Sequence, residues 1–288
     1  MKIYITGFLI FCSVHLSIAQ SRFGLLIGGG VLYYTGEMND RVLTHEKLLR
    51  PYGNIGLMYR LSNRFDVWAN YMHGTLVGND SLAIKYVLRN RNLNFQTTID
   101  EVGIYFGFHL LGAINGKHPN VIPYLFAGVT GYHFQPKSKL NGKWMDLQSI
   151  GTEGQYIKEG NYPKPYELYQ VAAPAGIGVE FRLSKALGLR VEAAHHFLFT
   201  DYLDDVSGNY PDSSSLAATP RGEEAVLLSS HIIEGGFPQK DVKRGDVKTN
   251  DSFTHIGIAL LWTPLKKGQS GSGSQKKKKK KKHCDAYH

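Results

Sequence analysis

The feature that most constrains this chain is a set of long stretches in which apolar side chains alternate with small or charged ones. In the stretch Leu187–Phe199 the odd-numbered positions are apolar apart from His195, whereas the even-numbered ones include Arg190 and Glu192. A period of two residues is that of a β-strand, because successive side chains of a strand point to opposite faces. The chain is therefore expected to consist of strands with one apolar face each.

Eight such stretches predict eight strands. Most of them exceed the length that is usual in soluble domains, and they are long enough to cross the apolar layer of a membrane when tilted. Turn or loop residues separate them. The predicted strands are Phe23–Tyr34, Tyr52–Leu61, Phe65–Val77, Phe95–Leu110, Ile122–Phe134, Leu168–Leu183, Leu187–Phe199 and Phe253–Trp262.

The two faces of these strands differ in a way that favours a membrane over a soluble core. One face is almost purely apolar, whereas the other mixes small residues with charged ones, as lipid outside and a packed polar interior require. A soluble sandwich would alternate as well, but its charges would face water. Aromatic residues such as Tyr33, Phe65, Tyr169 and Trp262 also gather near strand ends, as they do at membrane interfaces. The predicted fold is all-β, an eight-stranded antiparallel up-and-down transmembrane β-barrel.

The connections between the predicted strands alternate in length. Ser62–Arg64 and Ser184–Ala186 are tight and Gly112–Val121 is moderate, which is typical of periplasmic turns beneath longer extracellular loops. An even strand count would return both ends of the barrel to the periplasm. No stretch suggests a convincing amphipathic helix. The long connections are Thr35–Pro51, Gly78–Asn94, Gln135–Glu167 and Thr200–Ser252, and the last leaves ten strands open, with an extra hairpin around Ala225–Ile233.

The two ends of the sequence differ from the strand-rich region, which spans residues 20–265. Residues 1–19 combine an early lysine, an apolar run and small residues before the predicted cleavage after Ala19, which is the layout of a signal peptide and implies the outer membrane as the destination. Residues 266–288 form a Gly/Ser linker followed by the seven lysines Lys276–Lys282.

The basic charge of the chain belongs mainly to this tail. Residues 20–275 hold 25 Lys and Arg against 23 Asp and Glu, so the predicted barrel is close to neutral and nucleic-acid binding is not expected of it. After cleavage Cys284 is the one cysteine left, which excludes an intramolecular disulfide.

Charged residues on the inner face predict a closed lumen. The interior of an eight-stranded barrel is just wide enough to be filled by its own side chains. Buried charges must be paired, so a network of ion pairs is expected, with a proton or ion path as the alternative. The inward charges are Glu101, Glu180, Arg182, Arg190 and Glu192.

Two patterns suggest chemistry but do not carry it. His195 and His196 are adjacent on a strand and point to opposite faces, so they cannot bind one ion together, and no serine is placed beside His195 for a lipid hydrolase. Gly28-Gly29-Gly30 resembles a phosphate-binding loop in composition only, because it lies inside a strand, where close backbone approach explains glycine better. No catalytic residue, small-molecule substrate or cofactor is predicted, and the protein is not expected to be an enzyme.

Four acidic residues in the last long loop could offer oxygen ligands to Ca²⁺. They are Asp201, Asp204, Asp205 and Asp212. The glycine and glutamate of a defined calcium loop are missing, so no metal site is predicted.

Several sequence blocks follow one another along the chain. They include Tyr34-Thr35-Gly36-Glu37-Met38-Asn39, Leu49-Arg50-Pro51-Tyr52-Gly53, Tyr59-Arg60-Leu61-Ser62, Pro123-Tyr124-Leu125-Phe126-Ala127-Gly128-Val129, Gly151-Thr152-Glu153-Gly154-Gln155 and, most specific, Phe199-Thr200-Asp201-Tyr202-Leu203-Asp204-Asp205-Val206-Ser207. In this order the blocks resemble the PorG family of small outer-membrane barrels of the Bacteroidota type IX secretion system.

This resemblance implies a structural or docking subunit, held in outer-membrane lipid, that contacts a periplasmic ring made of a lipoprotein and its partner. It implies no catalytic residues. The Gly/Ser and lysine tail departs from the compact end expected of such a barrel. The alternatives are a stand-alone small barrel that acts as an adhesin or stabilises the membrane and, less favoured, an enzyme that modifies outer-membrane lipid.

Overall fold

The computed structural model describes residues 22–40, 45–111 and 119–264 of the chain. The predicted signal peptide and the lysine tail lie outside these ranges, as does most of the predicted connection Gly112–Val121. Within the described residues there are nine strands: β1 (Phe23–Thr35), β2 (Arg50–Arg60), β3 (Phe65–Asn79), β4 (Asn94–His109), β5 (Val121–Leu140), β6 (Lys143–Asp146), β7 (Tyr169–Arg182), β8 (Leu187–Leu198) and β9 (Ser252–Trp262). The short helices are η1 (Glu46–Leu48), η2 (Asp80–Leu82), α1 (Tyr86–Arg91), α2 (Leu147–Ile150), α3 (Ser213–Ala217) and α4 (Gly222–Ser229).

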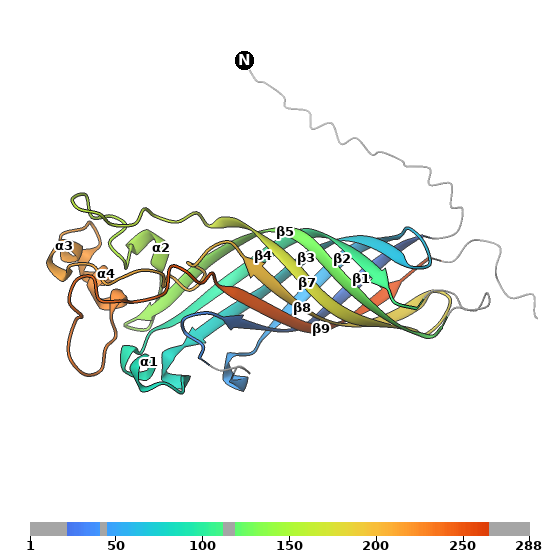
Figure 1. The fold of residues 1–288 in the computed structure, drawn as a ribbon, viewed down its shortest axis with the longest axis horizontal. Coiled ribbons are helices and arrows are strands. Elements are labelled where there is room, and N and C mark those ends of the chain that lie inside the picture. Colours follow the sequence, from blue (N-terminus) through green and yellow to red (C-terminus); the bar gives the residue numbers. More distant parts are fainter. Residues whose placement is uncertain (1–21, 41–44, 112–118, 265–288) are drawn as a thin grey trace, which may run out of the picture.

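Eight of the strands close into a barrel (Figure 1). Neighbouring strands pair in the order β4-β3-β2-β1-β9-β8-β7-β5, and a further pairing of β4 with β5 completes the ring. Every pairing is antiparallel. The predicted eight-stranded antiparallel barrel is thus confirmed, and its first and last strands lie side by side.

The long loops contain two features that the sequence did not locate. The extra hairpin does not lie around Ala225–Ile233, where helix α4 forms instead; it arises because β5 continues to Leu140 and turns back as β6. The sequence suggested no convincing amphipathic helix, and the α-helices of the described residues are four short ones in the long loops. Helices α2, α3 and α4 bury apolar residues against one another, a tertiary cause that local sequence periodicity does not reveal.

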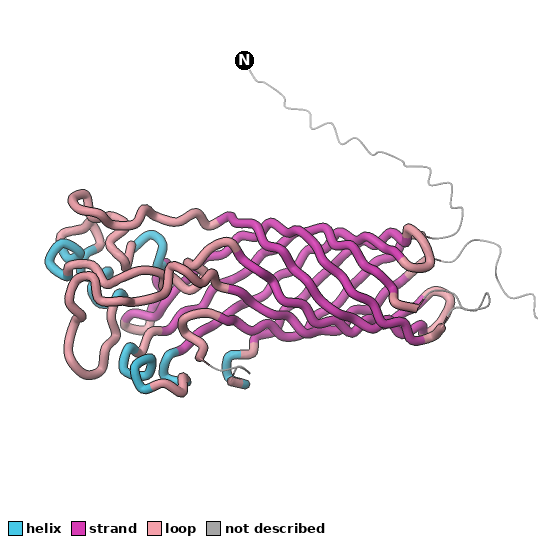
Figure 2. Tube along the Cα trace, viewed as in Figure 1, coloured by secondary structure: helices cyan, strands magenta, loops and turns pink. Residues whose placement is uncertain are grey.

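The two ends of the barrel are different. One end, called the turn end here, carries the tight connections Ser62–Arg64 and Ser184–Ala186. The other, called the loop end, carries the long connections and all the helices, which gather there in Figures 1 and 2. Long loops folded against one another therefore form a structured cap on one mouth of the barrel.

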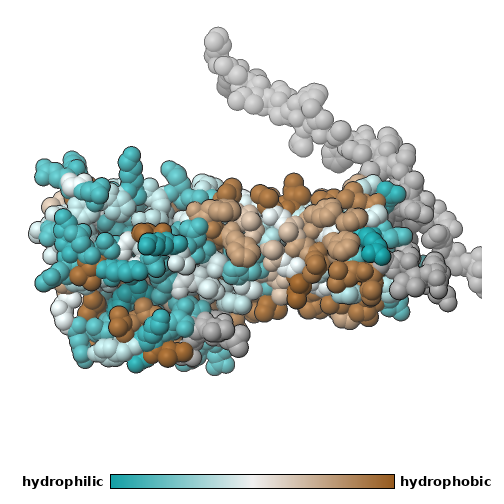
Figure 3. Space-filling model, viewed as in Figure 1, coloured by the Kyte–Doolittle hydropathy of each residue, from teal (hydrophilic) through white to brown (hydrophobic). Residues whose placement is uncertain are grey.

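An apolar band surrounds the half of the barrel nearer the turn end. Outward side chains such as Leu57, Ile104, Ile177 and Ile258 are 57 to 66% exposed, and Figure 3 shows brown apolar surface over this half, whereas the loop end is mostly hydrophilic. Exposed apolar residues on each of the eight barrel strands are the lipid-facing surface of a transmembrane barrel. No helix among the described residues is long and apolar enough to cross a membrane.

The lumen is filled by side chains. An aromatic layer that includes Trp68, Tyr105 and Phe126 packs across the half nearer the turn end. A larger apolar cluster, with Phe134 and Phe253 among its members, fills the loop end. Near the aromatic layer an internal cavity offers water only about 10 Å³, which is space for about one molecule. The interior is a packed core rather than a channel.

The glycine run of β1 has the role that the sequence predicted. Gly30 pairs with Gly257 of β9, and a Cβ atom built on Gly30 would lie 2.1 Å from the carbonyl oxygen of Ile256. No side chain fits at that distance. The glycines thus permit close approach of β1 and β9, and no phosphate-binding loop is formed.

Candidate functional site

Arg190 is the centre of a buried ion cluster near the turn end. Its side chain projects from β8 into the lumen and is 0% exposed. One guanidinium nitrogen lies 2.5 Å from Asp66 of β3 and 3.2 Å from Glu180 of β7. A charge taken out of water is stable only with such partners, so Arg190 ties together strands on different sides of the barrel.

Three further residues complete this turn-end ion cluster. Arg60 donates to Glu180 at 2.8 Å, and Arg182 lies 3.8 Å from the same carboxylate. Glu192 lies 3.8 Å from Arg190. The cluster therefore pairs three carboxylates with three guanidinium groups and is electrically balanced: Asp66, Glu180, Glu192, Arg60, Arg182 and Arg190.

Two aromatic rings lie against the guanidinium group of Arg190. The guanidinium carbon of Arg190 lies 5.2 Å from the ring centre of Trp68 and 5.0 Å from that of Tyr124. These distances are typical of cation–π contacts. Tyr124 also donates a hydrogen bond to Glu192. The charges and rings together obstruct the lumen at this height.

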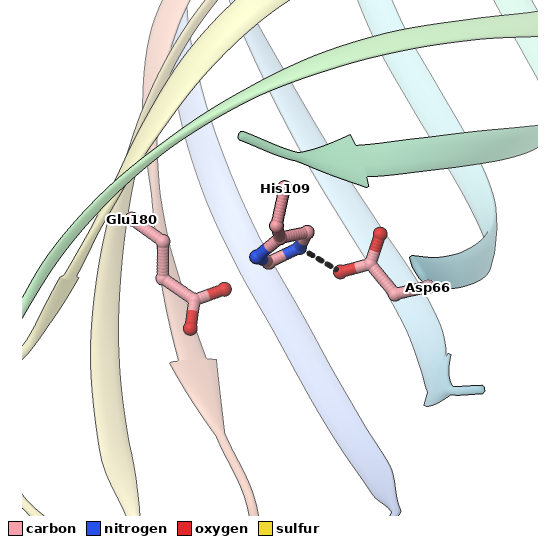
Figure 4. Close-up of side chains that lie close together, drawn as sticks. All are labelled: Asp66, His109 and Glu180. Atoms are coloured by element: carbon pink, nitrogen blue, oxygen red, sulfur yellow. Dashed lines mark hydrogen bonds and ion pairs between the residues drawn. The ribbon is translucent and has the colours of Figure 1, made fainter. Parts of the chain in front are cut away.

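Asp66, His109 and Glu180 also have the spacing of a metal site. Figure 4 shows the three side chains turned toward one another, with His109 Nε2 2.9 Å from Asp66 Oδ2. The same carboxylates already contact Arg190 and Arg60. Guanidinium groups thus hold the position that a cation would need, and two of the three residues, Asp66 and Glu180, belong to the turn-end ion cluster.

Glu101 lies apart from the turn-end ion cluster. Its carboxylate contacts His196 at 3.0 Å and accepts hydrogen bonds from Tyr105 at 2.9 Å and Thr130 at 3.1 Å. His196 in turn lies 2.9 Å from His255 of β9. Glu101, His196 and His255 thus form a second buried polar layer, which lies nearer the loop end than the turn-end ion cluster does.

The structure places all five predicted interior charges inside the barrel, but sequence reasoning missed some of their partners. Arg60, Asp66 and His109 were not among the predicted interior charges. The alternation in β3 could have identified Asp66, because it shares the parity of the inward-facing Trp68. The alternation could not show that Asp66 meets Arg190, which lies 124 positions later.

His195 points outward, as the alternation predicted. Its Nδ1 atom lies 2.9 Å from the hydroxyl of Thr254, so its hydroxyl partner is a threonine rather than the serine that a lipid hydrolase would need. Its ring also contacts Phe197 on the same face. This geometry gives no support to a hydrolytic site.

A second cluster of charges lies at the loop end, directly after β8. The motif Thr200–Asp205 turns back over the barrel mouth, and Asp204 meets two acidic residues from other segments. Oxygen atoms of Glu37, Asp204 and Asp251 all lie within 4.8 Å of one another. Glu37 follows β1, and Asp251 precedes β9. Carboxylates that the sequence separates widely are thus brought together by neighbouring strands.

Asp201 joins this group through Glu37. Its side chain is 8% exposed, and neither of its carboxylate oxygens has a hydrogen bond of normal geometry among the described residues. The hydroxyl of Ser207 and the carboxyl group of Glu37 are close enough to influence its pKa. We call Glu37, Asp201, Asp204 and Asp251 the loop-end carboxylate cluster.

The pKa values of this cluster are raised. Burial, and then the charge of Asp201, raises the pKa of Glu37 to about 7. Burial likewise raises the pKa of Asp201 to about 7. Asp204 and Asp251 are almost completely buried, and burial together with neighbouring carboxylates raises the pKa of each well above its usual range. Negative charge is therefore strongly disfavoured here unless a cation accompanies it.

The other acidic residues near this cluster are paired. Asp80 accepts two hydrogen bonds from Arg91, at 2.7 and 2.9 Å. Arg244 donates to Glu153 at 3.0 Å and lies 3.7 Å from Asp205.

Asp205 and Asp212, which the sequence grouped with Asp201 and Asp204 as possible calcium ligands, lie elsewhere. Asp205 turns toward Tyr166, whose hydroxyl donates to it at 2.7 Å, and Asp212 caps helix α3. Glu37 and Asp251, in contrast, were missed, because they belong to the cluster only through the pairing of β1 with β9.

The remaining motif residues fix this geometry. The hydroxyl of Thr200 accepts a hydrogen bond from the backbone of Tyr202, and Leu203 is fully buried in the apolar cluster beneath. Tyr202 stacks on Tyr166 with ring centres 4.6 Å apart. The motif thus packs over the barrel mouth, and its acidic side chains are buried.

Residues 1–223 match a sequence family described as "Domain of unknown function (DUF6089)". No curated protein matches the sequence. The description of the family assigns no activity, so the resemblance to the PorG family stays a prediction.

Among solved structures, Neisserial surface protein A is similar at 8% identity over 84% of this chain and 97% of that chain, with a TM-score of 0.42. Ail of Yersinia pestis is similar at 9% identity over 83% and 96%, with a TM-score of 0.38. OprG of Pseudomonas aeruginosa is similar at 9% identity over 85% and 98%, with a TM-score of 0.37. At these identities the likeness says nothing about function.

Proposed function

The chain belongs to the DUF6089 family, and we propose that it is a closed outer-membrane barrel that serves as a structural docking subunit of the type IX secretion machinery. In this role it would contact a periplasmic ring of a lipoprotein and its partner. The proposal combines the sequence resemblance with what the barrel is physically able to do.

The packed lumen is the observation that carries this proposal. Arg190 and its partners obstruct the turn end, aromatic rings fill the middle and the apolar cluster fills the loop end. A polypeptide cannot pass through such an interior, and even small solutes lack a continuous path. Function is therefore assigned to the surfaces at the two ends of the barrel.

The apolar band supports an outer-membrane location. Bacterial barrels of this kind are secreted proteins, which agrees with the apolar segment predicted to be a signal peptide in residues 1–19. The band lies next to the turn end, so the tight turns would sit just outside the membrane on the periplasmic side. The loop end would project from the cell.

A periplasmic partner would meet the turns Ser62–Arg64 and Ser184–Ala186. Each carries a basic residue, Arg64 and Lys185. Charges at the rim of an interface mainly affect encounter rate and salt dependence, so a partner with an acidic surface is the expected fit.

The test is crosslinking and co-purification from detergent-solubilised outer membranes of the native host. The paired change Arg64→Glu and Lys185→Glu should reduce recovery of the ring proteins, whereas Lys240→Glu in the loop cap should not. Deletion of the gene should abolish export of type IX cargo while leaving the membrane otherwise intact. If export and ring assembly both survive deletion, the docking role is wrong.

One observation favours a second candidate, a stand-alone barrel that binds a partner at the cell surface. Apolar side chains are exposed on the loop end, including Ile84 at 60%, Val87 at 74% and Ile233 at 67%. Helix α1 and the segment around Ile233 are joined, because the backbone of Ile233 donates to Asn90 at 3.1 Å. Exposed apolar residues on a folded cap are typical of a binding surface.

The variants Val87→Asp and Ile233→Asp separate the two candidates. Under the adhesin hypothesis they abolish attachment of cells to a target surface while cargo export continues. Under the docking hypothesis export depends on the turn-end residues, and these loop-end variants leave recovery of the ring proteins unchanged.

A further inference from the structure

We propose that the loop-end carboxylate cluster binds a Ca²⁺ ion, which links the segment after β1 to both ends of the β8–β9 connection. The proposal concerns Glu37, Asp201, Asp204 and Asp251 and does not depend on the docking role.

The spacing of the carboxylate oxygens fits a single ion. Ca²⁺ binds oxygen at about 2.4 Å, so two of its ligands can be at most about 4.8 Å apart. The ligand oxygens of Glu37, Asp204 and Asp251 lie within 4.8 Å of one another. Three carboxyl groups are thus already gathered around one point without any movement of the backbone.

Asp201 supplies independent evidence for a ligand. It is more than nine-tenths buried, neither of its oxygens has a hydrogen bond of normal geometry among the described residues, and the carboxyl group of Glu37 lies close to it. Glu37 Oε2 is also buried without a partner. Leaving a buried polar group unsatisfied is costly, and more so for a charged one. A cation between these residues would satisfy both.

The two clusters also differ in charge balance, and this difference favours a cation at the loop end. The turn-end ion cluster matches each carboxylate with a guanidinium group. At the loop end, the buried arginines Arg91 and Arg244 are already engaged by Asp80, Glu153 and Asp205. The four carboxylates of the loop-end cluster are therefore left without a salt-bridge partner among the described residues. A divalent ion would offset this excess.

The donor set selects the type of ion. Every candidate ligand is a carboxylate oxygen, with no histidine or cysteine among them. Hard oxygen ligands in an irregular arrangement suit Ca²⁺, whereas Zn²⁺ prefers nitrogen and sulfur, and Mg²⁺ demands a near-ideal octahedron. The loop end is also expected to face the cell exterior, where sites of lower affinity are sufficient.

Two neighbouring residues are fitted to the cluster. The hydroxyl of Tyr34 lies 2.6 Å from Asp204 and 2.9 Å from Asp251, although a phenol has one proton and can donate to only one of them at a time. A Cβ atom on Gly36 would lie 2.0 Å from Asp251 Oδ1. Gly36 thus allows the chain to pass directly over the carboxylates. The single proton of Tyr34 accounts for only one of its two short contacts with Asp204 and Asp251.

The primary test uses the purified full barrel in detergent, stripped with EGTA. Elemental analysis after dialysis against 1 mM Ca²⁺ should find one ion per chain in excess of the Ca²⁺ in the dialysis buffer. Terbium should bind in its place and luminesce when tyrosine is excited, because Tyr34 adjoins the cluster. Added Ca²⁺ should quench this signal at concentrations at least tenfold lower than Mg²⁺.

Neutral substitutions localise the site. Asp204→Asn and Asp251→Asn should weaken Ca²⁺ binding by at least tenfold. Asp241→Asn is the matched control, since Asp241 is an exposed residue of the same connection with a left-handed backbone that asparagine also tolerates. It should leave binding unchanged. Glu37→Gln, at a half-buried position, provides a second variant if the others fail to fold, and resistance of the unheated barrel to SDS reports folding.

A protease provides a readout of the structural consequence. Lys240, Lys243 and Lys248 lie in the β8–β9 connection and are exposed. Trypsin should cut there several times faster after EGTA, and Ca²⁺ should restore protection in the wild type but not in Asp251→Asn. If stripped and reloaded protein hold no ion and show no tyrosine-sensitised terbium signal, the carboxylates share protons instead and the proposal is wrong. Equal displacement by Mg²⁺ would overturn the assignment to Ca²⁺.

Discussion

Replacing Arg190 by methionine would remove the one fully buried guanidinium group that contacts both Asp66 and Glu180. Methionine is flexible and, although shorter, close to arginine in side-chain volume, so the change removes charge while leaving most of the volume filled. Asp66 would keep His109 as its close partner, with Arg60 3.7 Å away, and Glu180 would keep Arg60. Arg190→Met therefore tests whether the interior ion cluster holds the barrel together.

The expected cost follows from burial and partners. Removing one member of a buried ion pair typically destabilises a protein by about 3–5 kcal/mol, because the remaining charge is left uncompensated. The loss of two cation–π contacts acts in the same direction. Arg182→Met is the matched control, since Arg182 is 25% exposed and lies 3.8 Å from its carboxylate, and such a rim pair contributes about 0–1 kcal/mol.

Reversible urea unfolding of the barrel in lipid vesicles would measure both changes. Fluorescence of Trp68, 5.2 Å from Arg190, is a local reporter. Adding Asp66→Asn to Arg190→Met should recover part of the loss, since neutralising a stranded carboxylate removes its burial cost. If Arg190→Met costs no more than Arg182→Met, or the second substitution makes matters worse, the ion cluster is not the source of stability that we infer.

Three further predictions concern the lipid face, the lumen and the loop end. Val191→Arg, in the middle of the apolar band, should destabilise the barrel by about 2–4 kcal/mol in vesicle unfolding, whereas Val87→Arg on the polar cap should be nearly neutral. The unmodified protein should give no steady high conductance in planar bilayers, and a stable open channel would contradict the packed lumen. Gly36→Ala should lower Ca²⁺ affinity in the terbium assay, because its methyl group would collide with Asp251; unchanged affinity would place the ion elsewhere.

The strands and their faces could be predicted because the information is local. A period of two residues decides which side chains point inward, whatever the rest of the chain does. Arg190 and Glu180 were therefore placed inside, and Val191 and His195 outside, and the structure has them so.

The partners of the interior charges could not be predicted in this way. The alternation of side chains in β3 predicts that Asp66 faces the lumen. Its position along the barrel axis, however, depends on how each strand is staggered against the next. That stagger accumulates around the ring, and only the closed register brings Asp66 of β3 level with Arg190 of β8. The helices of the loops have the same origin, since α4 is short and is stabilised by contacts with distant segments.

The loop-end carboxylate cluster lies where the first and last strands of the barrel meet, and this position suggests a structural role for it. Every other pair of neighbouring strands in the barrel is joined by a turn or loop at one end, whereas β1 and β9 are the first and last strands and share no connection. Their contact relies on backbone pairing that ends at Thr35 and Ser252. Glu37 and Asp251 lie just beyond that point, on opposite sides of the seam. If both groups are ionised, their carboxylates repel each other and favour opening of the barrel where it lacks a covalent link, whereas a cation bound between them attracts both. A cation site is therefore most useful at this seam, where the strand pairing has no loop to support it.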